Sequence, residues 1–118
     1  MKRTFRYAWN GFKTAFSEER NLRIHTVVAS IALLMGFYFQ ITSLEWISLM
    51  LTIGLVISLE LVNSAIENLT DLVTKEQHPL AGKVKDISAA AVLFASVISV
   101  IVGLLIFVKY FQLLLINS

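Results

Sequence analysis

The 22 residues from Trp46 to Glu67 read WISLMLTIGLVISLELVNSAIE, and they decide how the rest of the chain is interpreted. Aliphatic side chains dominate this stretch, and no charged residue occurs between Glu45 and Glu60. At about 1.5 Å per residue, a helix of this length crosses a hydrocarbon core of roughly 30 Å. The stretch therefore predicts a transmembrane helix, which we expect over residues 45–72.

Two further uncharged stretches, of 19 and 22 residues, lie before and after this helix. The chain is 57% hydrophobic and only 15% charged, a composition that soluble domains rarely show. We therefore expect an all-α integral membrane protein that forms one membrane domain over residues 1–118. Its first and third spans are expected at residues 25–41 and 86–110.

An amphipathic helix is predicted before the first span, over about residues 2–20. Its aromatic side chains recur at helical spacing on one face, with basic side chains on the flank. The four aromatic residues are Phe5, Trp9, Phe12 and Phe16. Such a helix lies in the membrane interface at the inner leaflet. The alternative is that the aromatic face simply packs on the spanning helices.

Charge is distributed unevenly along the chain. Residues 1–25 carry six basic and two acidic side chains, whereas the connection at residues 40–45 carries only Glu45. The positive-inside rule therefore places the N-terminus and the second connection in the cytoplasm, with the chain crossing the membrane several times. Lys109, close to the C-terminus, argues mildly against this orientation.

Cysteine is absent, so disulfides and thiolate metal sites are excluded. The only partners expected from a chain of this class are the bilayer, small molecules and further copies, and no nucleic acid is expected. Small residues in the third span allow helices to approach closely in lipid. Three spans alone would leave polar groups poorly covered, so we expect a homo-oligomer.

The second span carries an unusual polar stripe. Glu60, Asn63, Ser64, Glu67 and Asp71 fall on one side of a helix, within roughly 60 to 100°. A carboxylate in hydrocarbon costs on the order of 3 kcal/mol even on the lenient insertion scale. The stripe must therefore face a bundle interior, an aqueous cleft or a bound cation.

The depth of the stripe suggests chemistry between a soluble anion and a lipid. Counting from the outer end, Glu67 lies near the inner interface, and Glu60 lies about 10 Å deeper, while Asp71 is outside the core. Glu67 is then placed to hold Mg²⁺, and Glu60 to accept a proton from a buried hydroxyl. Lys85 and Asp86 open the third span on the same side, where they can hold phosphate. These features favour ATP and Mg²⁺.

Each of these residues also has a purely structural interpretation. Glu67 and Asp71 are then only solvated, Asp86 is an N-cap, and Lys85 marks topology. For Glu60 the alternative is a buried ion pair. His25 and His78 are most simply a boundary residue and a loop residue.

A different function is a proton or cation pathway, because intramembrane carboxylates commonly mark one. A pathway needs polar residues across the whole bilayer, whereas residues 49–59 contain only Thr52 and Ser58. The five glycines are isolated, so neither GxxxxGK[ST] nor GxGxxG is present. If the chain binds ATP, it does so without a familiar nucleotide-binding loop.

Several short segments together resemble the signature of the prokaryotic diacylglycerol kinase family, whose members are small integral-membrane lipid kinases. The matching segments are ELVNSAIE at 60–67 with Asp71, HPLAG at 78–82, Lys85–Asp86 and AAAV at 89–92. The resemblance extends from about Phe5 to the third span. Glu19–Asn21 and His78–Pro79 are similar to the Gram-positive branch, whose members are undecaprenol kinases.

The resemblance implies a homotrimer of three-helix protomers, with an amphipathic surface helix and active sites shared between neighbouring subunits. It implies Glu60 as the general base and Glu19 and Glu67 as magnesium ligands. The positions that match residues around the nucleotide are Tyr7, Glu19, Glu67, Glu76, Gln77, His78, Lys85 and Asp86. Asn63 and Asp71 match a supporting polar cluster.

Two positions remain open. Glu18 adjoins Glu19, and counting from Asn10–Gly11 to Asn21 favours Glu19 as the ligand. His25 stands where some members of the family carry an acidic residue, so its role is undefined. The sequence as a whole predicts ATP- and Mg²⁺-dependent phosphorylation of a membrane lipid hydroxyl at the cytoplasmic interface, with undecaprenol as the first acceptor and diacylglycerol as the second.

Overall fold

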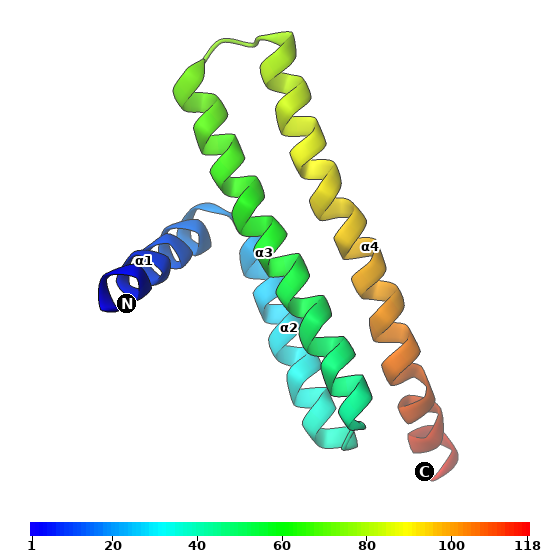
Figure 1. The fold of residues 1–118 in the computed structure, drawn as a ribbon. Coiled ribbons are helices and arrows are strands. Elements are labelled where there is room, and N and C mark those ends of the chain that lie inside the picture. Colours follow the sequence, from blue (N-terminus) through cyan, green and yellow to red (C-terminus); the bar gives the residue numbers. More distant parts are fainter.

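The computed structural model describes residues 1–118 as four helices and no strand (Figure 1). These are α1 (Lys2–Glu18), α2 (Arg20–Phe39), α3 (Ser43–Val73) and α4 (Pro79–Ile116). α2, α3 and α4 are each long and apolar enough to cross a membrane. The predicted all-α class, with three spans and a separate amphipathic helix, is confirmed.

α1 leaves the long helices at a sharp corner made by one residue, Glu19, whose backbone is extended. The Arg23 guanidinium donates to the carbonyls of Phe16 and Ser17 over 2.8 and 3.0 Å, which satisfies the free C-terminal end of α1. Phe5 and Trp9 remain exposed. The alternative that the aromatic face packs on the spanning helices therefore does not hold within the protomer.

The turn from α2 to α3 is tight and specific. Gln40 adopts a left-handed conformation at φ 53°, and the Ile41 N–H reaches back to the Gly36 carbonyl over 3.2 Å. A Cβ on Gly36 would lie 2.8 Å from the Trp46 ring, so this position leaves no room for a side chain. Thr42 then begins α3 with a capping box that its side chain shares with Glu45.

The connection between α3 and α4 comprises residues 74–78. His78 ends it, because its Nδ1 accepts a hydrogen bond from the Leu80 N–H over 3.1 Å, and Pro79 occupies the first turn, where a missing N–H is tolerated. The last helix thus begins at Pro79, seven residues before the predicted start at Asp86. Asp86 lies inside the helix, so the N-cap interpretation of this residue is wrong.

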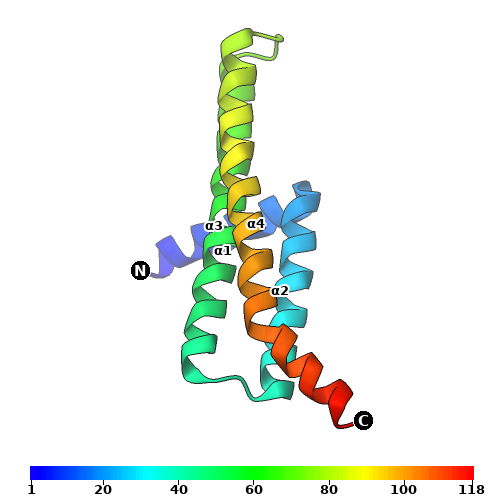
Figure 2. The same cartoon turned by 90° about the vertical axis from the view of Figure 1, so that its right-hand side faces the viewer.

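α3 packs along α4, and α2 packs beside the half of α3 that begins at Ser43 (Figures 1 and 2). At about 1.5 Å per residue, the 20 residues of α2 span about 30 Å, whereas the 31 of α3 and 38 of α4 span about 46 and 57 Å. The ends of α3 and α4 joined by residues 74–78 therefore project well beyond the start of α2. Only 13 of 118 residues are buried, so most of the apolar surface is left for lipid or other copies.

The end of the helix assembly near the α2–α3 turn is held by an apolar cluster and a polar clamp. Ile41, Leu49, Ile106 and Phe107 are buried together there. Glu45 closes the clamp, because it accepts from the Lys109 ammonium over 2.6 Å and from the Tyr110 hydroxyl. Lys109, whose charge argues mildly against the predicted orientation, is the ion-pair partner of Glu45.

Candidate functional site

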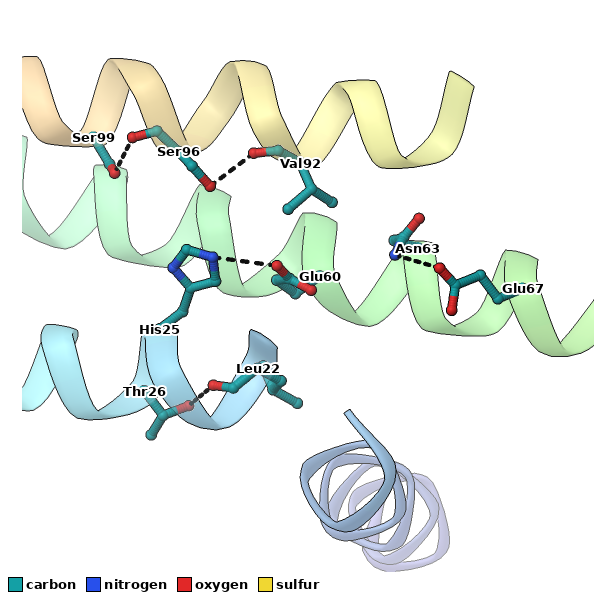
Figure 3. Close-up of polar contacts among 9 residues, drawn as sticks. All are labelled: Leu22, His25, Thr26, Glu60, Asn63, Glu67, Val92, Ser96 and Ser99. Atoms are coloured by element: carbon teal, nitrogen blue, oxygen red, sulfur yellow. Dashed lines mark hydrogen bonds and ion pairs between the residues drawn. The ribbon is translucent and has the colours of Figure 1, made fainter. Parts of the chain in front are cut away.

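Glu60 lies inside the helix assembly although it is a carboxylate. Its side chain is 2% exposed, and its Oε1 lies 3.2 Å from Nε2 of His25 on α2 (Figure 3). The contact is close but not aligned as a hydrogen bond, which leaves Oε1 without a hydrogen-bond donor. The predicted stripe thus contains a buried carboxylate with an unsatisfied oxygen, which is uncommon in proteins.

The corner between α1 and α2 reaches the same face of α3. Glu19 is half-buried there, and its Oε1 accepts from the Ser64 hydroxyl over 3.4 Å. Ser64 stands one turn beyond Glu60 on α3, so the corner places the Glu19 carboxylate beside the stripe. Glu18 ends α1 as an exposed residue with no side-chain partner.

A second pair of contacts extends the stripe towards α4. The Asn63 amide donates to Glu67 Oε1 over 3.1 Å, and its oxygen accepts from the Ser88 hydroxyl over 2.6 Å. The Ser88 contact therefore fixes the orientation of the amide, and the amide in turn orients Glu67. A carboxylate whose oxygen is held in this way is prepared to bind a cation.

At the end of α3 and α4, a polar cleft of about 490 Å³ is open to solvent. The predicted nucleotide residues that line it are Glu76, Gln77, His78 and Lys85, together with Asp71. Lys85 donates to Asp71 Oδ1 over 2.6 Å, so its ammonium is held at the wall of the cleft. Four of the predicted nucleotide residues therefore share one region at this end of the fold.

Four of the predicted nucleotide residues do not line this cleft, because Glu19 and Glu67 lie beside the stripe and Tyr7 and Asp86 lie elsewhere. Tyr7 is exposed on α1, which diverges from the long helices, and Asp86 is exposed on α4. Neither side chain makes a hydrogen bond or an ion pair in the protomer. A single copy therefore does not bring together all the residues that are predicted to surround the nucleotide.

The donor chemistry of the stripe fits Mg²⁺. No three His, Asp or Glu side chains converge into a complete metal cluster. Mg²⁺ in nucleotide-dependent enzymes, however, usually takes only one or two carboxylates, the rest of its shell being phosphate oxygens and water. The two carboxylates that would hold it are those of Glu19 and Glu67, which contact the neighbouring α3 residues Ser64 and Asn63 respectively.

A second hollow lies on the apolar side of Glu60. It has a volume of about 380 Å³, opens between α2 and α4, and is lined mainly by aliphatic side chains. His25 is the one ionisable residue among its walls. Glu60 does not line this groove itself, but it contacts His25, which does, and it follows Val56 and Ile57 of the lining by about one helical turn.

Sequence reasoning missed three contributors to this arrangement. The sequence defines no role for His25 and assigns no partner to Ser64. It indicates Ser88 only as a small residue of the third span. The spacing of Ser64 from Glu60 placed both on one face, but no local pattern shows which residue of another helix lies opposite.

Comparison with known proteins gives one consistent result. A family model described as "Prokaryotic diacylglycerol kinase" matches residues 6–107. Undecaprenol kinase of Bacillus subtilis is 43% identical over 105 residues, covering 89% of this chain and 85% of the relative. Diacylglycerol kinase of Escherichia coli K12 is 30% identical over 105 residues, covering 89% and 86%. Diacylglycerol kinase of Synechocystis is 42% identical over 101 residues, covering 85% of this chain and 58% of the relative.

Proposed function

This chain belongs to the prokaryotic diacylglycerol kinase family and is a membrane lipid kinase, and from that premise we propose that it transfers the γ-phosphoryl group of ATP to the hydroxyl of a membrane lipid alcohol. Undecaprenol is the first acceptor that we propose, because the relative from Bacillus subtilis bears that name. Diacylglycerol is the second.

The observation that carries the proposal is the burial of Glu60 on the polar stripe, about one helical turn beyond Val56 and Ile57, which line an apolar groove. A lipid alcohol has an apolar chain and one hydroxyl, so it needs both environments at one point. Glu60 is placed there as the general base. It accepts the hydroxyl proton as the oxygen forms its bond to the γ-phosphorus and the bond to the leaving ADP breaks.

The remaining residues position the nucleotide. Glu19 and Glu67 hold Mg²⁺, which when bound neutralises charge on the β- and γ-phosphates. Lys85 lies near the phosphates, and the wall formed by residues 76–78 contacts the nucleotide. Tyr7 and Asp86 complete the site together with a neighbouring copy, which agrees with the proposed homotrimer and with the large apolar surface of the protomer.

The proposed location is the bacterial plasma membrane, with the N-terminus and residues 74–78 on the cytoplasmic side. The supporting features are the six basic side chains among residues 1–25 and the cleft near residues 76–78, where ATP is available. A pathway for protons or cations has no comparable support. On the outer side of Glu60, the buried positions of α3 are Val56 and Leu49, which are apolar.

The test is transfer of labelled γ-phosphate to lipid by purified protein in mixed micelles. Glu60→Gln keeps the size of the side chain but cannot accept a proton, so we expect turnover to fall on the order of 10²- to 10⁴-fold with the oligomer intact. Ser58→Ala, at an exposed position of the same helix, should remain active. Retention of most turnover by Glu60→Gln would remove Glu60 from the mechanism. Undecaprenol and diacylglycerol compared in the same detergent decide the acceptor.

A further inference from the structure

Glu19 is the only residue between α1 and α2, so the position of its carboxylate depends on the angle at which these helices meet. Its N–H donates to the Ala15 carbonyl of α1 over 2.8 Å, and its carbonyl accepts from the Arg23 N–H of α2 over 3.3 Å. Between these two bonds the backbone of Glu19 is extended, at φ -108° and ψ 110°. A change in the angle between the helices is therefore taken up by the backbone of Glu19, and it moves the side chain that we propose as a metal ligand.

The Glu19 side chain has little to hold it in place by itself. Its one hydrogen-bond partner is the Ser64 hydroxyl of α3, at 3.4 Å. Hydrogen bonds from a hydroxyl to a carboxylate are usually about 2.5–2.7 Å long, so this contact is weak. Glu19 also forms no ion pair. The direction of its carboxylate is therefore set mainly by the backbone of the corner.

Arg23 ties the two helices together at this corner. Because side chains of a helix lean toward its N-terminus, the Arg23 guanidinium reaches back over the first turn of α2 to the end of α1. Its Nη1 donates to the carbonyls of Phe16 and Ser17 over 2.8 and 3.0 Å. These are the only side-chain hydrogen bonds between α1 and another helix, and α1 otherwise diverges from the long helices (Figure 1). The cation also lies at the negative end of the α1 dipole.

We propose that Arg23 is a positioning residue for the metal site: by holding the last carbonyls of α1 it fixes the backbone of the corner, and with it the Glu19 carboxylate beside α3. Arg23 does not itself touch the metal or the nucleotide. The inference rests on the proposed function, because Glu19 needs a fixed direction only if it is a ligand.

The experiment measures Mn²⁺ binding to the purified protein in detergent with a non-hydrolysable ATP analogue, from the EPR signal of the free ion. Mn²⁺ is a suitable probe because it prefers the same carboxylate and water ligands as Mg²⁺. Arg23→Met keeps an unbranched side chain without a donor, so we expect Kd for Mn²⁺ to rise about tenfold. Arg20→Met removes the same charge at the exposed first position of α2, and it should leave Kd within about twofold.

A double-mutant cycle separates the positioning of Glu19 from a general loss of structure. If Arg23 acts through Glu19, adding Arg23→Met to Glu19→Gln leaves Kd at the value of Glu19→Gln alone, because the ligand is already lost. A general loss of structure weakens binding further in the double variant. The same cycle in lipid phosphorylation should show an equal rise in the Mg²⁺ needed for half-maximal activity, with kcat at saturating Mg²⁺ within about twofold of the wild type.

Arg23→Lys is the conservative variant, because its ammonium can still donate to the carbonyls at the end of α1. Its Kd for Mn²⁺ should lie between those of the wild type and Arg23→Met, about threefold above the wild type. If Arg23→Met does not assemble, the cycle is run with Arg23→Lys, and Glu19→Gln should again abolish its effect.

An unchanged Kd in Arg23→Met overturns the inference. So do additive losses in the double variant, an equal loss in Arg20→Met, or no gain of Arg23→Lys over Arg23→Met. Failure of the proposed function looks different: the wild type would bind no Mn²⁺ with the nucleotide analogue, or Glu19→Gln would bind it as tightly as the wild type does.

Discussion

The Ser88 hydroxyl on α4 donates to the Asn63 amide oxygen on α3 over 2.6 Å. Through this contact the amide nitrogen faces Glu67, whose Oε1 accepts from it over 3.1 Å. A serine on α4 therefore determines how a proposed metal ligand on α3 is oriented. Loss of a partner that orients a metal ligand commonly costs about 10- to 100-fold in metal affinity or activity.

Ser88→Ala should raise the Mg²⁺ concentration for half-maximal activity about tenfold, because the amide is then free to rotate and Glu67 loses its fixed direction. The measurement is a Mg²⁺ titration at saturating ATP and lipid. Ser96→Ala is the matched control, since its hydroxyl bonds only to the Val92 carbonyl of its own helix. An equal change in both variants would contradict the relay through Asn63.

Glu19→Gln should weaken the response to Mg²⁺, whereas Glu18→Gln should not. Glu19 is half-buried beside Ser64, and Glu18 is exposed at the end of α1. Loss of one of two carboxylate ligands is expected to raise the required Mg²⁺ by about tenfold or more. The same titration distinguishes the two residues, and a larger effect of Glu18→Gln would reverse the assignment made from the sequence.

Gly36→Ala should destabilise the turn between α2 and α3. An added Cβ would lie 2.8 Å from Cη2 of Trp46 and 3.1 Å from Cδ1 of Ile41. Overpacking of this kind costs about 1–3 kcal/mol, since the ring must move away from its site. Thermal unfolding in detergent measures the loss. Gly54→Ala, where no atom lies within 4 Å of the new Cβ, is the control that should not unfold earlier.

Glu45→Gln should lower the thermal stability more than Asp71→Asn does. Glu45 accepts from Lys109, Tyr110 and the backbone of Thr42, and its side chain is 12% exposed. Asp71 has one partner, Lys85, and is 55% exposed, where an ion pair contributes little. The midpoint of unfolding by heat decides the order. Equal shifts of the unfolding midpoint would show that the contacts of Glu45 add no more stability than the exposed pair of Asp71 and Lys85.

Much of the architecture follows from local properties of the chain. Uncharged stretches of about 20 residues predict spanning helices, because lipid leaves no alternative for the backbone polar groups. The aromatic spacing from Phe5 to Phe16 predicts an amphipathic helix for the same local reason. The spacing of Glu60 and Glu67 also places both on one face of α3, since helical periodicity alone decides that. The start of α4 at Pro79 was harder to predict from the sequence, because the charged residues before Asp86 are typical of a loop.

Tertiary structure decided which groups meet. The fold brings three groups against α3: His25 of α2, the Glu19 corner that meets Ser64, and Ser88 of α4. These contacts could not be predicted from the sequence, because contacts between helices depend on packing and not on spacing along one helix. The sequence by itself determined that a carboxylate stripe had to be sheltered inside a membrane protein. The fold determined that the imidazole of His25 lies 3.2 Å from the carboxylate of Glu60, and that the amide of Asn63 orients Glu67.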